Sequence, residues 1–389
     1  MPDRVLRFGV LGLSRGFVLM RSSLVADPRC RLVAAADLRA EARAAFEAEF
    51  GANTHETAEA LCADPEVDVV YVASPHELHA EHAILAAGHG KHVLVEKPMA
   101  LDLAGCREMR EAARAAGVQL VVGPSHSFDA PIAHAARLIA SGDFGRPRMI
   151  TAMNFTDFLY RPRRPEELDR AHGGGVVFSQ AVHQVDVVRA LAGAPVKSVR
   201  AQVLGWDLAR PADGAYQALL AFEGGLSASL SYSGYGRYDT DALLGWIGET
   251  GTPKSATDYA GARRRLSAAS ETDQKRARAY GAAAAPPPPA TQFHEHFGYV
   301  MASCEHADLQ PTATGVEVYG EAQRRTIHLE PPTVLRAGVI DELWDAIVKG
   351  AAPRHDGAWG QANLAVCLAL LRSSDEGREV KLAELEIAP

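Results

Sequence analysis

Three side chains in this sequence have the types and spacing of a proton-transfer site. His183 and Asp186 lie three positions apart, so on a helix they share one face, where the carboxylate can orient or polarise the imidazole. An imidazole with a pKa near neutrality can take the hydroxyl proton when a carbinol carbon loses a hydride. Lys97 follows an apolar run and could stabilise a developing alkoxide, or titrate with a lowered pKa. Taken alone, Lys97 is more typical of a solvated strand end, and His183 of a hydrogen-bonded core histidine.

A tight turn near the N-terminus has part of a dinucleotide-binding pattern. Gly12 ends an apolar run, but Ser14 occupies the second glycine position of Gly-x-Gly-x-x-Gly, and Gly16 is out of phase. Asp37 ends the next apolar run, where a carboxylate would accept hydrogen bonds from an adenosine ribose. A 2′-phosphate would meet like charge there, so we expect NAD rather than NADP, although Arg39 could offer a phosphate partner.

The first third of the chain alternates between apolar runs and segments of helical periodicity. The apolar runs cover residues 6–11, 31–36, 67–72, 91–95 and 119–122, and the helical segments cover 14–25, 40–50, 78–87 and 103–116. Gly51 follows the second helical segment, as a C-terminal cap would. Apolar strands joined by helical crossovers predict an α/β fold, a Rossmann doubly wound parallel sheet over residues 1–124. Such sheets bind ligands at the carboxyl ends of their strands.

Three longer motifs together resemble the glucose-fructose oxidoreductase, inositol dehydrogenase and rhizopine catabolism (Gfo/Idh/MocA) family, over nearly the whole chain. They are Ser74-Pro75-His76, the run from Gly90 to Pro98, and Gly173-Gly174-Gly175 followed by His183 and Asp186. The resemblance implies a NAD-dependent oxidoreductase in which Lys97 is catalytic or orients the substrate, His183 is the general acid/base, and Asp186 is its partner. Ser179 and Ala181 depart from the family pattern inside the third motif, which affects the substrate contacts expected of that helix.

We expect the cofactor to contact the glycine turn, the end of the second strand, and the loops with the Ser-Pro-His and Glu-Lys-Pro motifs. The candidate cofactor-binding residues are Gly12, Ser14, Arg15, Asp37, Ser74, Pro75, His76, His79, Glu96 and Lys97. Two histidine groups, 76–82 and 294–296, could suggest a metal site. We predict no metal, because no set of acidic or cysteine partners accompanies them and hydride transfer to NAD requires none. We assign His76 and His79 to the cofactor groove instead.

From residue 149 the hydrophobic period becomes strand-like. Runs at 149–155, 198–203, 216–222 and 226–232 predict a C-terminal α+β domain over residues 125–389 with a largely antiparallel open sheet. Charged helical sequence at 263–285 and a polyproline run at 286–289 indicate a surface insertion at about 255–292. Helical segments at 340–348 and 362–371 should pack near the N-terminal domain. We expect this C-terminal domain to bind the substrate and to mediate oligomerisation.

Prolines hold residues 158–165 extended, and this segment carries Arg161, Arg163 and Arg164, whose planar forks suit carboxylates. A dicarboxylate would need such a cluster and a sugar polyol would not; a solvated basic loop or a subunit contact is the alternative. Residues 154–168 and 232–236 resemble the family branch of bacterial 4,5-dihydro-4,5-dihydroxyphthalate dehydrogenases. That resemblance implies a dicarboxylated dihydrodiol that becomes an aromatic diol on oxidation. The candidate substrate-binding residues are Asn154, Tyr160, Arg161, Arg163, Arg164, Ser179 and His183.

Two other functions stay open. The protein could be a sugar or cyclitol dehydrogenase. A polar, arginine-poor substrate pocket would favour this function. It could also be a cofactor-binding regulator without turnover, but the presence of Lys97, His183 and Asp186 together argues against an inert protein.

Composition limits the remaining classes. The 389 residues, 47% hydrophobic and 23% charged, suit two globular domains, and the formal net charge of -8 offers no basic field for nucleic acid or an anionic membrane. Five scattered cysteines without a Cys-x-x-Cys pair fit free thiols in a reducing cytoplasm. We see no signal peptide and no long apolar run, so we expect a cytoplasmic protein with a small-molecule substrate. The resemblance implies a homodimer or homotetramer.

Overall fold

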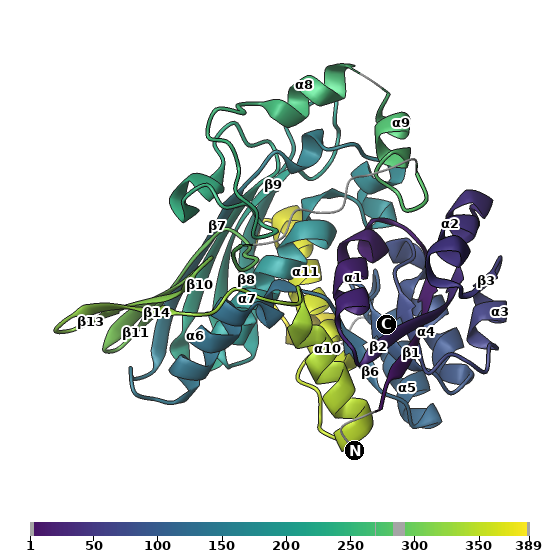
Figure 1. The fold of residues 1–389 in the computed structure, drawn as a ribbon. Helices are drawn as coiled ribbons and strands as arrows, with labels where there is room; N and C mark the ends of the chain where they lie inside the picture. The colour runs from purple at the N-terminus through teal and green to yellow at the C-terminus, as the bar shows by residue number, and fades with distance from the viewer. Residues whose placement is uncertain (1–3, 269, 283–291, 387–389) are drawn as a thin grey trace. The chain divides into compact units, whose positions relative to one another are not determined.

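The computed structural model describes residues 4–268, 270–282 and 292–386, which divide into two compact units. The first unit contains a six-stranded parallel sheet in the order β3-β2-β1-β4-β5-β6 (Figure 1). Its strands are β1 (Leu6–Leu11), β2 (Cys30–Ala36), β3 (Asn53–His55), β4 (Val69–Val72), β5 (His92–Val95) and β6 (Leu120–Val122). The connecting helices are α1 (Arg15–Ala26), α2 (Ala40–Phe50), α3 (Ala58–Cys62), η1 (His76–Leu78), α4 (His79–Gly88) and α5 (Leu103–Ala116). This arrangement confirms the predicted Rossmann sheet.

The central strands of this sheet are apolar because both of their faces are covered. All four residues of β4 are buried, as are the last three of β5. Gly51 ends α2 with a φ of 59°, in the left-handed region, as the predicted cap requires. Strand β3 and helix α3 were not expected, because segments of three and five residues are too short for their periodicity to show.

Two later segments also belong to the first unit, residues 273–287 and 333–364, of which 283–287 lie outside the described residues. The second segment holds α10 (Ala337–Trp344), the π-helical turn η9 (Asp345–Lys349) and the start of α11 (Gly357–Glu376). Trp344 Nε1 donates to the carbonyl of Arg4 at 2.9 Å, and Val122 N donates to the carbonyl of His355 at 2.8 Å. The helical segment at 340–348 thus groups with the N-terminal unit, as its expected packing requires.

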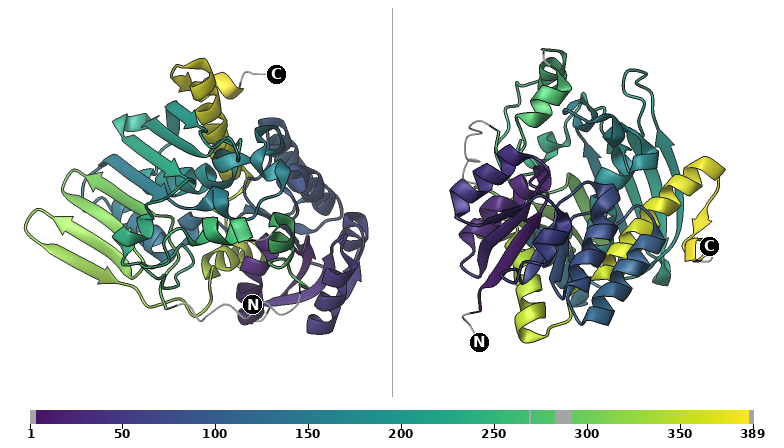
Figure 2. Two further views of the ribbon diagram at one scale, coloured as in Figure 1. Left: turned by 90° about the horizontal axis from the view of Figure 1, so that it is seen from above. Right: turned by 90° about the vertical axis from the view of Figure 1, so that its right-hand side faces the viewer.

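The second unit is built on a nine-stranded sheet in the order β14-β13-β12-β11-β7-β10-β9-β8-β15 (Figure 2). Its strands are β7 (Pro147–Phe155), β8 (Val196–Leu204), β9 (Ala215–Phe222), β10 (Ser227–Ser233), β11 (Tyr299–Cys304), β12 (Ala307–Thr312), β13 (Gly315–Gly320), β14 (Arg324–His328) and β15 (Val380–Lys381). Only β7 and β10 pair in parallel, so the largely antiparallel sheet is confirmed among the described residues. The meander from β11 to β14 was not predicted.

Two helices of this unit, α6 (Ala130–Ala140) and α7 (Val182–Ala192), pack against each other and against the sheet. The other short helical elements of this unit are η2 (His126–Phe128), η3 (Phe158–Tyr160), η4 (Pro165–Leu168), η5 (Arg170–His172), the π-helical turn η6 (Val177–Ala181), η7 (Glu223–Gly225), η8 (Thr240–Leu244) and the C-terminal α12 (Ala383–Glu386). The π-helical turn η6 leads directly into α7, and such turns are frequent at functional sites.

The insertion contains two short helices, α8 (Gly261–Ala268) and α9 (Glu271–Arg276), where the sequence suggested one helical run over 263–285. The predicted polyproline linker at 286–289 lies outside the described residues. Within the described ranges, no helix has the length and apolar character needed to cross a membrane.

Candidate active site

The turn between β1 and α1 is fitted closely to the end of β4. Gly12 has a φ of +95°, and a Cβ there would lie 2.9 Å from the carbonyl oxygen of Ala73. Ser14 Oγ donates to the same carbonyl at 2.8 Å instead of capping α1. Arg15 is the exposed first residue of the helix. The turn leads into the N-terminus of α1, and backbone N–H groups at a helix N-terminus can bind an anion such as a dinucleotide diphosphate.

Asp37 lies at the end of β2 with its side chain only 10% exposed. Its Oδ2 accepts the N–H of Leu13 at 2.8 Å, and Arg39 Nε donates to Oδ1 at 3.0 Å. The carboxylate therefore borders the glycine turn, where an adenosine ribose would bind in a Rossmann domain. Its pairing with Arg39 moderates the local negative charge.

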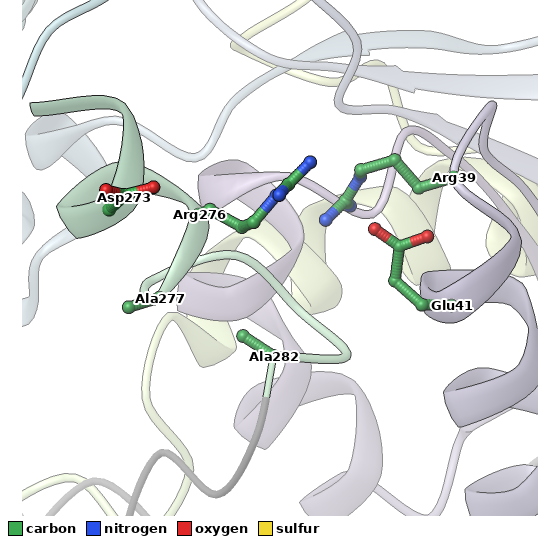
Figure 3. A pocket seen from close by; sticks show the side chains of 6 residues that line it. All are labelled: Arg39, Glu41, Asp273, Arg276, Ala277 and Ala282. Carbon is green, nitrogen blue, oxygen red and sulfur yellow. The ribbon is translucent and has the colours of Figure 1, made fainter.

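A short segment of the insertion, residues 273–282, lines a cavity beside this carboxylate. The cavity measures ≈ 330 Å³, and Figure 3 shows Arg39 and Arg276 extending toward each other across it, above Glu41. The other lining residues are Asp273, Ala277 and Ala282. Tyr280 anchors the segment: its ring meets Phe17 edge-on at 5.1 Å.

His79 is a correction to the expected cofactor contacts. Its ring is fully buried, with Nδ1 2.8 Å from the carbonyl oxygen of Pro98 and Nε2 2.9 Å from that of Ser74. A ring so enclosed cannot touch a cofactor; it ties the Ser-Pro-His loop to the Glu-Lys-Pro loop. Ser74 Oγ is in turn 2.9 Å from His82 Nδ1. Of the two histidines assigned to the groove, only His76 is partly exposed, with Pro75 beside it.

The Glu-Lys-Pro loop is positioned by Glu96. Tyr71 Oη donates to Glu96 Oε1 at 2.6 Å, and a Cβ at Gly16 would lie 3.2 Å from that same oxygen. Gly16 does not match the dinucleotide-binding glycine pattern. The close approach of α1 to Glu96 explains why a residue without a side chain lies there. Lys97 follows, half-buried, at the carboxyl end of β5.

In the second unit, His183 and Asp186 both hold the loop that follows β6. His183 Nδ1 lies 3.1 Å from Ser125 Oγ, and Asp186 Oδ2 accepts the N–H of Ser127 at 3.0 Å. Asp186 is 1% exposed. His183 and Asp186 thus contact Ser125 and Ser127, the two residues on either side of His126. The i, i+3 spacing of His183 and Asp186 did not predict these contacts.

His126 belongs to the site and was missed by sequence reasoning. Its ring centroid lies 4.8 Å from that of His183, and both rings pack against Phe297 at 5.0 Å. His126 Nδ1 is 2.7 Å from Asp129 Oδ2. Burial opposes protonation of His126, but Asp129 outweighs it and raises the pKa of the imidazole. A signal was present, because Ser125-His126-Ser127 comes just after a strand of the parallel sheet.

Helix α7 is fixed to the sheet by buried tyrosines. Tyr232 Oη donates to Gln180 Oε1 at 3.1 Å, and Tyr216 Oη donates to Gln184 Oε1 at 2.8 Å. Ser179, which departs from the family pattern, donates its hydroxyl to the carbonyl of Gly175. Its hydroxyl is therefore used within the helix, at the π-helical turn.

The three arginines of the predicted cluster do not form one carboxylate-binding site, because Arg161 and Arg164 lie beside carboxylates of the protein itself. Arg161 pairs with Asp157 at 3.1 Å and with Glu249 at 3.6 Å, and Asn154 Nδ2 donates to Glu249 at 3.1 Å. Tyr160 Oη donates to Asp207 at 2.6 Å. Arg164 extends outward with its side chain 44% exposed, within 3.8 Å of Glu167.

Arg163 differs from its neighbours because part of its guanidinium is buried without a hydrogen-bond partner in the described part of the chain. Its guanidinium lies 3.6 Å from the ring centroid of Phe158 and donates to that residue's carbonyl at 3.0 Å. Its Nε is buried without a hydrogen-bond partner among the described residues, and burial lowers the pKa of Arg163 to about 10. Arg163 interacts electrostatically with Tyr232, whose ring stacks on Phe297 at 6.3 Å. A buried cation of this kind favours a bound anion.

In the second histidine group, His296 has a structural role. His296 Nε2 is 2.9 Å from the carbonyl oxygen of Ile247, and Gly298 N donates to its Nδ1 at 3.1 Å. Within the described parts of the chain, no three His, Cys, Asp or Glu side chains are arranged to hold a metal ion.

A Rossmann sheet with a diphosphate-ready turn, followed by a sheet domain with paired imidazoles, defines a nicotinamide-dependent oxidoreductase. The chain belongs to the Gfo/Idh/MocA family: residues 6–124 match its NAD-binding Rossmann fold, and residues 132–253 match its C-terminal domain. It is an oxidoreductase with a NAD-binding fold.

Individual relatives span most of the chain. It is 44% identical over 373 residues to the 1-carboxy-3-chloro-3,4-dihydroxycyclohexa-1,5-diene dehydrogenase of Comamonas testosteroni, covering 94% of each chain. It is 30% identical over 260 residues to the scyllo-inositol 2-dehydrogenase (NAD(+)) of Bacillus subtilis, covering 64% of this chain and 73% of that one. A solved structure from Bordetella bronchiseptica RB50, named as a dehydrogenase, superposes with a TM-score of 0.92 at 37% identity, covering 97% of this chain and all of that one.

Proposed function

We propose that the protein oxidises a carboxylated cyclohexadiene cis-diol to the aromatic diol, with NAD⁺ as hydride acceptor. The observation that carries this proposal is Arg163, a half-buried arginine of the substrate domain whose buried Nε has no hydrogen-bond partner among the described residues. A substrate carboxylate would complete its hydrogen bonding and balance its charge. The relative from Comamonas, named for a carboxylated dihydroxycyclohexadiene, supports the same class of substrate. Within this class we favour the dicarboxylate 4,5-dihydro-4,5-dihydroxyphthalate.

In the proposed mechanism His183 takes the hydroxyl proton. Ser125 Oγ lies at its Nδ1, so a proton on Nδ1 would be donated to Ser125 and would leave Nε2 as the accepting atom. A nicotinamide held near Pro75, His76 and Lys97 would supply the hydride acceptor. Lys97 is proposed to stabilise the alkoxide charge that develops in this step. Asp186 acts by holding the loop at Ser127.

For the cofactor, we propose that the start of α1 binds the diphosphate and Asp37 the ribose diol. The cavity between Arg39 and Arg276 would then take the adenine, with guanidinium groups against the ring faces and carboxylates near its amino group. Pro75, His76 and Lys97 would lie toward the nicotinamide. The carboxylate of Asp37 favours NAD over NADP.

Oligomerisation and location are part of this proposal. The outward face of the nine-stranded sheet exposes Met149 and Leu219 by 53% and 54%, and we propose that it pairs in a homodimer or homotetramer. Sedimentation velocity would test it, because a monomer at micromolar concentration would contradict the proposal. Five free cysteines are consistent with a cytoplasmic protein.

The substrate proposal is tested with two neighbouring arginines. Arg163→Met should raise KM for the carboxylated diol by at least tenfold, because a charged hydrogen bond contributes about 1.5–3 kcal/mol. Arg164→Met, which removes an exposed arginine, should change KM by less than about twofold. With the carboxyl-free cyclohexadiene cis-diol, the two variants should behave alike. An unchanged KM in Arg163→Met would reject the carboxylate site.

A polyol dehydrogenase is the second candidate, favoured by the 30% identity to the scyllo-inositol enzyme. A polyol substrate would use the Asn154, Glu249 and Arg161 network as hydroxyl partners. Turnover of myo-inositol or glucose, with none of the cis-diol, would select it.

A further inference from the structure

We propose that His126 is a second catalytic base, which removes the ring C–H proton in the step that makes the oxidised product aromatic. This inference rests on the proposed function. It concerns the step after hydride transfer, for which the site described above has no other assigned group.

The chemistry of the substrate requires two separate proton transfers. Loss of a hydride from one carbinol carbon, and of the proton from its oxygen, leaves a hydroxycyclohexadienone. The aromatic diol forms when the neighbouring carbinol carbon gives up its C–H proton, the C–H electron pair becomes a ring π bond, and the carbonyl oxygen takes up a proton. No further oxidant is needed, because this second step is an isomerisation.

Two imidazoles lie close enough together to serve two such transfers on neighbouring atoms of one ring. The ring centroids of His126 and His183 are 4.8 Å apart, and both rings pack against the ring of Phe297. His183, protonated in the first step, can return its proton to the carbonyl oxygen. His126 can take the C–H proton from the adjacent carbon.

The surroundings of His126 prepare it for this work. Asp129 Oδ2 lies 2.7 Å from its Nδ1 and fixes the proton there, so Nε2 is the accepting atom. The hydrogen bond found for the ring is the one at Nδ1, and the His126 side chain is 16% exposed, so the residue is not fully enclosed by the described part of the chain. The carboxylate of Asp129 then stabilises the imidazolium that forms.

The backbone around His126 is also fixed from both sides. Ser125 is held by His183 and Ser127 by Asp186, so the imidazole is carried between two anchored residues. A side chain with a purely structural role would not need an accepting nitrogen left open beside the proposed acid/base.

The test follows two products in one stopped-flow reaction with the phthalate cis-dihydrodiol and NAD⁺, NADH at 340 nm and the aromatic diol by its own absorbance. In the native enzyme both signals should rise together. In His126→Gln, NADH should form at a near-native rate, while the aromatic diol should lag by about 100-fold, the usual contribution of a general base. Deuterium on the carbon that loses the proton should slow only this lagging phase.

Two further variants keep the test decisive. Asp129→Asn retains the His126 ring and should give an intermediate lag, whereas His134→Gln, which changes a histidine on α6 that is not part of the site, should give none. A lag of equal size in the native enzyme, or simultaneous signals in His126→Gln, would overturn the assignment. Loss of NADH formation in His126→Gln would place His126 in the first step instead. Absence of NADH in the native enzyme would reject the proposed function itself.

Discussion

Asp186 accepts a hydrogen bond from the backbone N–H of Ser127 at 3.0 Å, in a fully buried setting. The sequence spacing suggested that this carboxylate serves His183, but the bond shows that it also fixes the loop beside that histidine. Asp186 is therefore a positioning residue for the loop that carries His126.

Asp186→Ala should destabilise the protein by about 1–3 kcal/mol, because the N–H of Ser127 would remain buried without an acceptor. Asp186→Asn keeps an oxygen at the same place and should retain most of that stability. Urea unfolding of the two variants measures the difference. Equal stabilities would contradict a role for this hydrogen bond.

Gly12→Ala should weaken NAD⁺ binding strongly. The residue has a φ of +95°, and its new Cβ would lie 2.9 Å from the backbone oxygen of Ala73, so the turn must shift at a cost of about 1–3 kcal/mol. Calorimetric titration with NAD⁺ should show an affinity lower by at least about tenfold. Gly51→Ala, in open space at the end of α2, is the matched control and should leave the affinity unchanged.

Asp37→Ser should shift the coenzyme preference toward NADP. The substitution removes the negative charge near the proposed 2′ position and frees Arg39, which now bonds Asp37 at 3.0 Å. The ratio of kcat/KM for NADP⁺ to that for NAD⁺ should rise at least tenfold. An unchanged ratio would show that the ribose binds elsewhere.

The stability contributed by His126 should depend on pH in a defined direction. Burial opposes its charge, but Asp129, with Glu295 and Glu249, raises its folded pKa above the ordinary value of 6.5. A raised pKa stabilises the folded state below pH 6.5, and that contribution disappears as the pH rises through the folded pKa.

Asp129→Asn should therefore lose more stability relative to the native protein at about pH 5.5 than at about pH 8.5. Chemical unfolding at the two pH values gives the comparison. A difference that grows toward high pH would contradict the sign.

The sequence predicts those parts of the fold in which periodicity and chemistry coincide. Helix α2 and its Gly51 cap fall at the expected residues, because alanine, glutamate and arginine favour the helix and glycine ends it. The meander β11–β14 escaped notice because its short strands mix buried and exposed polar residues. The two helices of the insertion were merged into one for lack of a clear break.

The candidate site was predicted in part, for a physical reason. Gly12 and Asp37 lie where strands end, which the alternation of strands and helices indicates, and His183 lies on the helix that its spacing to Asp186 suggested. The roles of His79 and His126 depend on burial and on contacts distant in sequence, which periodicity does not contain. The same holds for Arg163. It is an arginine like its neighbour Arg164, but its Nε is buried whereas the Arg164 side chain is exposed.

The most direct test of the proposed function is the initial rate of NADH formation from the cis-dihydrodiol of phthalate, measured beside the carboxyl-free cis-diol, myo-inositol and glucose, with NAD⁺ and with NADP⁺. The account predicts rapid reduction of NAD⁺ with the carboxylated diol and a much smaller kcat/KM with the others. Turnover of a polyol alone, or equal rates with and without the carboxylates, would contradict it.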